Sequence, residues 1–261
     1  MELFYLTRNQ MSELLNGVAE PHLKSPLTIL QCAWAKTHPA EKMKGNMLGA
    51  VISTSLPPIF EKMIKMSHRD PGFSLNEIIA LGNQIEYSHY SITSVQNWVK
   101  RDFKDLIQSP AHGKKYSLDQ AALIFMIDDL KATLDFESIR KLLAIVFLNP
   151  QAEEEANLNG IRPLQIYTAY TSIFEELDQN NDQVLDLSGH ESGKRNQDHI
   201  LENLIKQKAD EYAAGLEQVS DREREAISNL IFIAMLSVQT SYFQSMAKRF
   251  FNATLFLQNM S

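Results

Sequence analysis

Apolar residues recur at spacings of three and four along most of the chain, and Leu, Met, Ala and Phe supply most of them. This is the period of an amphipathic helix, whereas the alternation that marks a strand never lasts. The pattern therefore predicts a nearly all-α protein. In the first third of the chain it predicts helices over residues 9–18, 26–36 and 58–66. The last of these begins at Pro58, where a proline fits the first helical turn.

Two short helices are predicted after the break at Asp70-Pro71-Gly72. Ser74 and Glu77 form a capping box for the first, and Ser91 caps the second. The apolar residues of SITSVQNWVKRD are expected on the inward face of the second helix, at Ile92, Val95, Trp98 and Val99. Its outward face then carries hydroxyl, amide and basic side chains, at Thr93, Ser94, Gln96, Asn97, Lys100 and Arg101. This is the layout of a helix-turn-helix.

A basic step leads directly into two capped helices in GKKYSLDQAALIFMIDDLKATLDFESIRKLL, residues 113–143. In the segment that leads into it, FKDLIQSPAHGKK (residues 103–115), Pro110 and Gly113 predict a loop or small hairpin. Ser117 and Gln120 form a second capping box. The helix behind them is apolar nearly all round, which predicts a central core helix. Asp135 caps the next helix after a loop of only a few residues.

The composition changes after Pro150. A linker, an amphipathic helix over residues 164–177 and a polar loop are predicted, followed by a helix over residues 199–216 and a long final helix. A continuous helix from Asp221 to Leu257 would span about 55 Å at about 1.5 Å per residue, and a helix of that length usually needs a partner. Residues 226–247 carry no charge and are long enough to span a bilayer. Their many polar side chains favour burial in a soluble core or a dimer interface instead.

Charge is distributed unevenly along this chain of 261 residues, whose net charge is −7. Residues 88–118 hold five basic and two acidic side chains, whereas residues 151–217 hold five basic and fourteen acidic ones. The net charge argues against a protein coated in nucleic acid. A short basic island in an acidic chain instead predicts one surface for an anion, with the remainder serving another role.

Residues 74–143 resemble the winged helix-turn-helix of MerR-type transcription regulators. In that family a recognition helix of the form Ser-x-x-Thr-(Leu/Ile/Val)-Arg-x-(Tyr/Trp) precedes a basic wing ending in Gly-x-Arg-x-Tyr-(Ser/Thr), and an apolar helix and a Phe-Ser-Leu-Glu-Glu-Ile-Arg-x-Leu-Leu helix follow. Here SITSVQNW supplies the first motif, GKKYSLDQ the end of the wing, and LDFESIRKLL the last element. The resemblance covers about a quarter of the chain, which has Gln96 where that family usually has Arg. The turn between the first two helices is also longer, and no MerR effector domain aligns after Leu143.

From about Pro58 to its end, the chain looks like a bacterial family catalogued as a domain of unknown function, whose hallmark is Lys-Lys-Tyr-Ser before a long apolar helix. The MerR resemblance implies a DNA-binding site in which the basic side chains neutralise phosphates and the amides of Gln96 and Asn97 contact base edges. The implied site comprises Thr93, Ser94, Gln96, Asn97, Lys100, Arg101, Lys114 and Lys115. Tyr116 is expected to pack at the base of the wing.

Motifs for other chemistry are weak or missing. The sequence holds no P-loop, no G-x-G-x-x-G, no Ser elbow and no paired His spacing, so no enzymatic activity, cofactor or metal site is predicted. The loop DQNNDQVLDLSG, residues 178–189, imitates a calcium-binding EF-hand. However, Gln183 stands where the sharp turn needs Gly, and Gly189 stands where the bidentate Glu should be. An acidic surface loop is favoured, with calcium binding left open.

Cys32 is the only cysteine, so no intramolecular disulfide can form and a reducing, cytoplasmic setting is expected. A lone cysteine is expected to be a small buried hydrophobe. The N-terminus MELFYLTRNQMSELL lacks the basic step and apolar core of a secretory signal.

The sequence thus predicts an all-α cytoplasmic protein with a MerR-like winged helix-turn-helix (residues 73–149) between an N-terminal helical segment (1–72) and an acidic helical region for dimerisation or an effector (150–261). The favoured function is sequence-specific binding to double-stranded DNA, as a transcription regulator. A homodimer through the final helix and no membrane partner are expected. The alternative is a protein-interaction adaptor that retains the winged fold without binding DNA.

Overall fold

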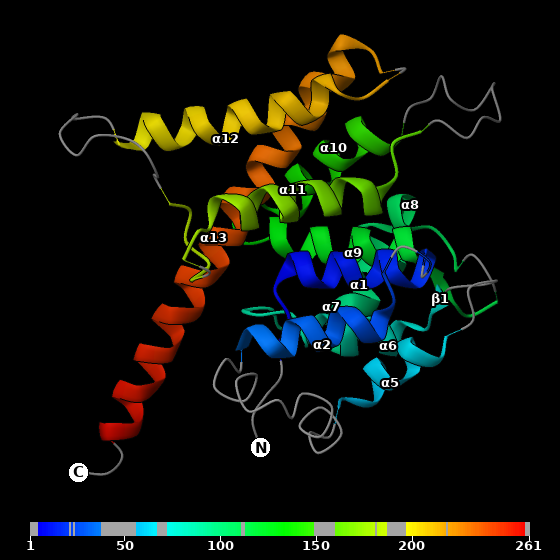
Figure 1. Cartoon of the computed structure of the whole chain (residues 1–261), viewed down its shortest axis with the longest axis vertical. Coiled ribbons are helices and arrows are strands. Elements are labelled where there is room, and N and C mark those ends of the chain that lie inside the picture. Colours follow the sequence, from blue (N-terminus) through cyan, green and yellow to red (C-terminus); the bar gives the residue numbers. More distant parts are fainter. Residues whose placement is uncertain are drawn as a thin grey trace. The chain divides into compact units, whose positions relative to one another are not determined.

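The computed structural model describes residues 5–20, 22, 24–37, 56–66, 72–110, 113–148, 160–180, 182–186, 197–217 and 219–258. The protein is mostly helical and ends in a long helix, as the hydrophobic period predicts (Figure 1). The chain divides into two compact units, Met1–Ile124 and Phe125–Ser261, and each is described by itself below. The boundary falls inside helix α9 (Leu118–Leu130). The division at residues 72 and 149 stays a prediction.

The first unit contains short helices and two paired two-residue strands. Its elements are α1 (Arg8–Ala19), α2 (Pro26–Thr37), α5 (Pro58–Lys65), β1 (Gly72–Phe73), α6 (Leu75–Gly82), α7 (Ile92–Asn97), the π-helix η1 (Trp98–Asp102), α8 (Lys104–Ile107), β2 (Tyr116–Ser117) and the start of α9. Helix α1 packs against α2, α2 against α5, and α5 against α6. These contacts bury Met11, Leu14 and Phe60 completely.

The predicted helix caps are present. The Ser74 hydroxyl accepts a hydrogen bond from the Glu77 N–H, and the Glu77 carboxylate accepts one from the Ser74 N–H. Ser91 caps α7 in the same way through the Ser94 N–H, at 3.1 Å. Such side chains supply acceptors for N–H groups that have no partner within the first helical turn, which is why they set where each helix begins.

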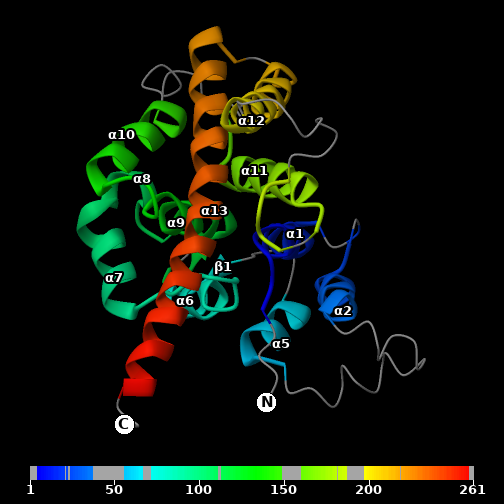
Figure 2. The same cartoon turned by 90° about the vertical axis from the view of Figure 1, so that its left-hand side faces the viewer.

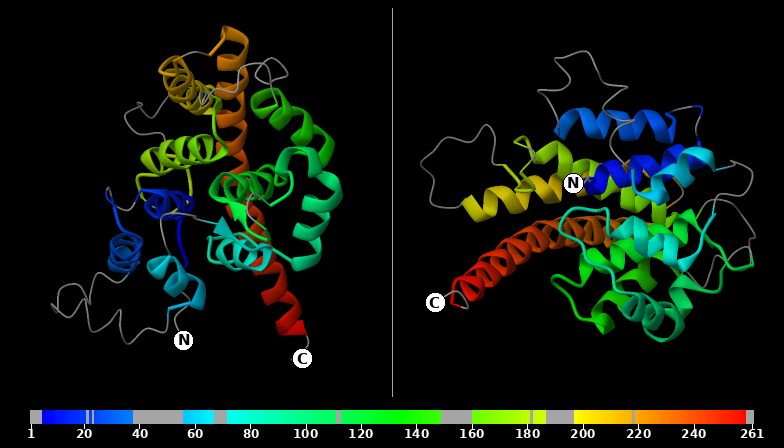
Figure 3. Two further views of the ribbon diagram at one scale, coloured as in Figure 1. Left: turned by 90° about the vertical axis from the view of Figure 1, so that its right-hand side faces the viewer. Right: turned by 90° about the horizontal axis from the view of Figure 1, so that it is seen from below.

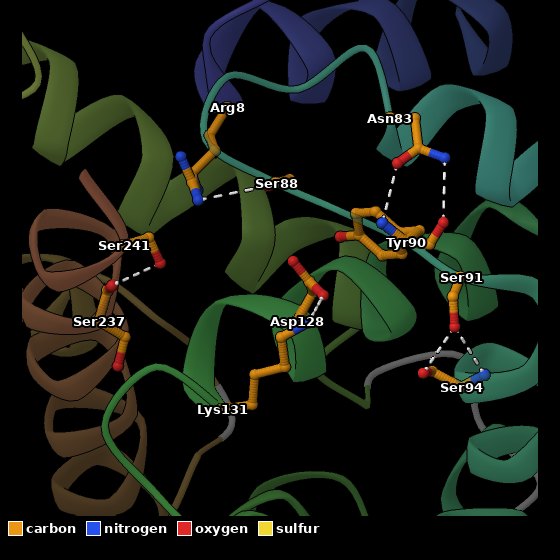
Figure 4. Close-up of polar contacts among 10 residues, drawn as sticks. All are labelled: Arg8, Asn83, Ser88, Tyr90, Ser91, Ser94, Asp128, Lys131, Ser237 and Ser241. Atoms are coloured by element: carbon orange, nitrogen blue, oxygen red, sulfur yellow. Dashed lines mark hydrogen bonds and ion pairs between the residues drawn. The ribbon is translucent and has the colours of Figure 1, made fainter. Parts of the chain in front are cut away.

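The turn between α6 and α7 is held by side chains and by the N-terminal segment. Asn83 binds both backbone groups of Tyr90: its Oδ1 accepts from the Tyr90 N–H at 2.8 Å, and its Nδ2 donates to the Tyr90 carbonyl at 3.1 Å (Figure 4). Leu6 forms an isolated parallel bridge with Ile85, and the Arg8 guanidinium donates to the Glu86 carbonyl at 3.1 Å. The long turn is therefore an ordered part of the first unit.

The second unit is helical. After the end of α9 it contains α10 (Phe136–Phe147), α11 (Pro163–Leu177), α12 (Gln197–Ala214) and α13 (Asp221–Gln258). Helix α13 packs against α10, α11 and α12 (Figure 2). Its first half is a core helix, with buried residues at helical spacing: Ile227, Leu230, Ile231, Ala234, Met235 and Val238. By length and composition α13 could also cross a membrane, and 44 % of its most apolar window is buried inside the structure.

The last part of α13 differs from the first. Every residue from Ala247 to Leu257 is exposed, and the helix continues beyond α10, α11 and α12 (Figure 3, left). This stretch, which we name the terminal segment (residues 247–257), includes Phe250, Phe251 and Phe256, which are 65 %, 62 % and 64 % exposed. Exposed aromatic groups at this density usually mark a binding surface.

Cys32 corrects an expectation, because its side chain is exposed rather than buried. Helix α2 buries Ile29, Leu30, Ala33 and Trp34, which fall on one face at spacings of one, three and four. Cys32 lies between these positions along the sequence and therefore on another side of the helix.

Candidate nucleic-acid interface

Helix α7 and the π-helix η1 have a buried face that fixes them to the first unit. Val95, Trp98 and Val99 are buried, and α7 packs against α6. The ring of Tyr90 meets the edge of the Trp98 ring at 6.4 Å between centroids. Gly82 lets the Tyr90 ring lie directly against α6, because a Cβ added there would lie 2.5 Å from Tyr90 ring carbons. The inward face thus follows the prediction at three of its four positions.

The fourth position, Ile92, is a correction: its side chain is 54 % exposed. Ile92 is the first residue of α7, three positions before Val95. On a helical projection it lies at the edge of the buried face, next to Gln96 one turn later. Periodicity alone did not distinguish this edge position from the buried centre of the face.

The predicted outward face is exposed to solvent. Thr93, Ser94 and Asn97 are exposed and Gln96 is half-buried. Ser94 is partly used by the helix cap, because its hydroxyl accepts a hydrogen bond from the Ser91 hydroxyl at 2.7 Å. The side-chain amides of Gln96 and Asn97 make no hydrogen bond to any residue that the structure describes. Both amides are therefore available to an outside partner.

The helix changes type after Asn97. The Phe103 N–H donates to the Trp98 carbonyl at 2.8 Å, five residues back, which is the hydrogen bond of a π-helix. Phe103 is buried and ends this turn. Because a π-turn holds one more residue than an α-turn, it changes the direction in which Lys100 and Arg101 leave the helix. The short helix α8 then stands where the sequence predicted a loop, and its exposed Lys104 is a basic side chain that the predicted site did not include.

The two basic residues of η1 differ in their surroundings. Arg101 is exposed, but its Nε donates to the Asp102 Oδ1 at 2.8 Å, and Nη2 donates to Oδ2 at 3.4 Å. The hydrogen bonds and charge of this carboxylate raise the pKa of Arg101. Lys100 is also exposed and forms no ion pair with any described residue. Asp102 therefore offsets the charge of Arg101 and leaves that of Lys100 available.

The segment predicted to form a wing lies between α8 and β2, and its end is attached to the start of α6. Strand β2 pairs antiparallel with β1, with Phe73 opposite Tyr116 and Gly72 opposite Ser117. Tyr116 is buried, as predicted, and burial raises the pKa of its phenol. Lys114 and Lys115 precede β2, are exposed, and form no ion pair within the described chain. Strand β1 leads directly into α6, and α6 packs against α7. Helix α7 and the end of the wing are therefore both attached to α6. Residues 111 and 112 of the wing lie outside the described part.

Gln120 joins the wing base to α9. Its Oε1 accepts from the Ser117 N–H at 2.8 Å, which completes the predicted capping box. Its Nε2 also donates to the Ile107 carbonyl at 2.6 Å and to the Ser109 carbonyl at 2.8 Å. Between these two carbonyls stands Gln108, at φ 60° and ψ −175°, a conformation that is populated almost only by glycine. The sequence predicted the cap but not this second role of Gln120.

Comparison with known proteins places the chain in a family. A family model described as "Domain of unknown function (DUF1836)" matches residues 70–171. A protein of Bacillus subtilis (strain 168), described as "Uncharacterized protein YkrK", is 30 % identical over 250 residues, which cover 95 % of this chain and 97 % of that protein. The chain belongs to the same uncharacterised family as this B. subtilis protein. No solved structure matches it significantly. The prediction that the chain resembles an uncharacterised bacterial family thus agrees with both matches.

The DUF1836 match spans the whole candidate interface. It begins just before β1 and ends within α11, so it includes α6, α7, η1, the wing and α9. The matched residues 70–171 extend across the boundary between the two compact units, which lies after Ile124. The B. subtilis relative is similar over nearly the full length, including the regions that correspond to the N-terminal helices and to α13.

The acidic loop after α11 uses its own carboxylates. The two oxygens of Asp178 accept from the N–H groups of Asp182 and Gln183, at 3.0 and 2.9 Å. Asp186 accepts from the N–H groups of Gln179 and Asn180. Burial raises the pKa of the Asp178 carboxyl against the lowering effect of its two N–H donors. These carboxylates fold the loop, and Gly189 lies outside the described residues.

Proposed function

We propose that this protein binds double-stranded DNA sequence-specifically as a transcription regulator, through a MerR-like winged helix-turn-helix. The element order β1, α6, turn, α7 with η1, wing, β2 and α9 supports the proposal, as does the pairing of the wing's end with the strand before α6. The observation that carries it is the outward face of α7 and η1. It presents two amides and a lysine that have no partner among the described residues, whereas its opposite face is buried in the first unit.

The residues of the proposed DNA-binding site, on this face and on the wing, have different roles. Lys100, Lys114 and Lys115 neutralise phosphates, and each phosphate contact steepens the salt dependence of binding by about 0.9 in the logarithmic slope. Gln96 and Asn97 can each make two hydrogen bonds to the N6 and N7 edge of adenine in the major groove. Thr93 and Ser94 lie beside them. Arg101 contributes less than Lys100, because Asp102 already compensates its charge.

The test is fluorescence anisotropy with a pool of fragmented genomic DNA at two salt concentrations. We expect salt-sensitive binding by the wild type and its loss in the double variant Lys114→Glu, Lys115→Glu. A matched control is Lys65→Glu, which changes an exposed lysine at the end of α5 and should keep wild-type binding. Binding that survives in the wing variant, or no binding at low salt, would contradict the proposal.

We also propose that the terminal segment of α13 pairs with a second copy of the chain. A helix with exposed aromatic side chains on several sides is disfavoured in water, and a two-fold symmetric dimer presents two recognition helices to two half-sites. Light scattering should show a dimer for the full chain and a monomer for a chain that ends at Met246, which keeps the buried half of α13. A truncated protein that stays dimeric would refute this. A monomeric full-length protein that binds lipid vesicles through this segment would assign it to a membrane surface instead.

The adaptor alternative rests on the Arg101–Asp102 ion pair. Asp102 and the exposed Asp105 reduce the positive charge next to α7, which suits a protein partner better than a polyanion. Failure of DNA binding, together with an intact fold and an intact dimer, would favour this alternative.

A further inference from the structure

The exposed side chain of Ile92 gives the proposed reading face an apolar group that the polar pattern did not predict. It is 54 % exposed at the first position of α7. Isoleucine is disfavoured in an exposed first helical turn, because its branched Cβ restricts the side chain and about half of its apolar surface stays in water. Single exposed apolar residues are common on proteins. The exposure of Ile92 is therefore informative only through the residues that lie next to it.

Ile92 lies next to an amide. Residues four apart on a helix are neighbours, so Ile92 and Gln96 adjoin each other, and Thr93 and Asn97 form the parallel row. The amides of Gln96 and Asn97 make no hydrogen bonds within the described chain. The helix therefore presents two similar pairs. In the first, the apolar side chain of Ile92 lies beside the amide of Gln96; in the second, the methyl and hydroxyl groups of Thr93 lie beside the amide of Asn97.

This pairing matches one class of base pair. In the major groove, thymine alone presents an apolar group, its C5-methyl, and adenine presents the N6 and N7 edge that Gln or Asn binds with two hydrogen bonds. We propose that Ile92 contacts a thymine methyl group while Gln96 binds an adjacent adenine, so that α7 reads an A·T-containing half-site. This inference rests on the proposed DNA-binding function.

The test uses deoxyuridine, which differs from thymidine only by lacking the methyl group. Thymines of a fragment selected by the wild-type protein are replaced one at a time, and dissociation constants are measured for the full-length protein. Loss of one buried methyl contact should weaken wild-type binding about fourfold, from about 0.8 kcal/mol per methyl-sized group. Ile92→Ala should bind the thymine fragment more weakly by a similar factor and should not respond to deoxyuridine at the same position.

Leu27→Ala is the matched control, because Leu27 is a similarly exposed aliphatic residue on α2; it should keep the wild-type response. If Ile92→Ala responds to the lost methyl group as the wild type does, or if no thymine position matters to the wild type, the inference fails while the wing lysines still support DNA binding. If the wild type shows no salt-sensitive binding, both the inference and the proposed function fail.

Discussion

Gln120→Glu separates the two roles of Gln120. Glutamate is a normal partner in a capping box, so the variant keeps an acceptor for the Ser117 N–H. It loses the amide donor that binds the Ile107 and Ser109 carbonyls. The bond to Ile107 is partly buried and the bond to Ser109 is exposed, so at about 1 kcal/mol for each hydrogen bond the expected loss in the free energy of unfolding is about 1–2 kcal/mol. Repulsion between the new carboxylate and the two carbonyl oxygens adds to this loss.

The stability of the Gln120→Glu variant should depend on pH. Two carbonyl oxygens disfavour the carboxylate form, so the pKa of the introduced carboxyl should be higher in the folded than in the unfolded protein. A group of this kind contributes stability that is fully present below the unfolded pKa, which is about 4.3 for Glu, and that is lost as pH rises through the folded pKa. The protonated acid can also donate one of the two lost hydrogen bonds.

Urea unfolding followed by tryptophan fluorescence suits this test, since Trp34 and Trp98 are the only tryptophans and both lie in the first unit. The reference is Gln120→Ala, which lacks both donor and acceptor at every pH. The advantage of the Glu variant over the Ala variant should shrink as pH rises from about 4 to 7. A Glu variant as stable as the wild type at pH 7 would refute the view that the amide donor holds the wing base.

Three further substitutions probe the same region. Gly82→Ala places a Cβ within 2.5 Å of the buried Tyr90 ring, so it should lower the free energy of unfolding by about 1–3 kcal/mol in urea denaturation; wild-type stability would contradict that packing. Gln108→Gly relieves a conformation that costs about 1–3 kcal/mol and should raise the urea midpoint, whereas an unchanged or lower midpoint would argue against strain there. Asp102→Asn leaves Arg101 without its ion pair, and we expect tighter DNA binding with a salt slope steeper by about 0.9; unchanged anisotropy titrations would show that Arg101 lies away from the phosphates.

The sequence predicted those features whose causes are local. Ser74 with Glu77 and Ser117 with Gln120 are capping boxes because the two partners are only three residues apart. The core helix α9 was predicted because it is apolar on every side, and residues from Ala121 to Ile127 are indeed buried. These signals need no knowledge of the rest of the fold.

Features that depend on distant partners were missed. The π-turn at Trp98 comes with the burial of Phe103, and π-turns have no short sequence signature. The strained backbone at Gln108 is bracketed by two hydrogen bonds from Gln120, twelve residues away in sequence. Ile92 fits the apolar period equally well whether it is covered or exposed. Only the arrangement of the surrounding elements determines whether its side chain is buried. The sequence thus predicted the exposure of Thr93, Ser94 and Asn97 and missed the exposure of Ile92.

Helix α9 limits how this protein can be divided. It begins at the wing, where Ser117 caps it, and its last turns belong to the second unit, where the Tyr170 hydroxyl donates to Asp129 at 2.7 Å. A fragment that stopped at the boundary would cut a continuous helix, and one that kept α9 whole would deprive the buried Phe125 ring of Tyr167, whose ring lies 5.9 Å away between centroids. The predicted winged region is therefore not expected to fold on its own: a gene fusion that transfers it would also have to include α11, which contacts the far end of α9.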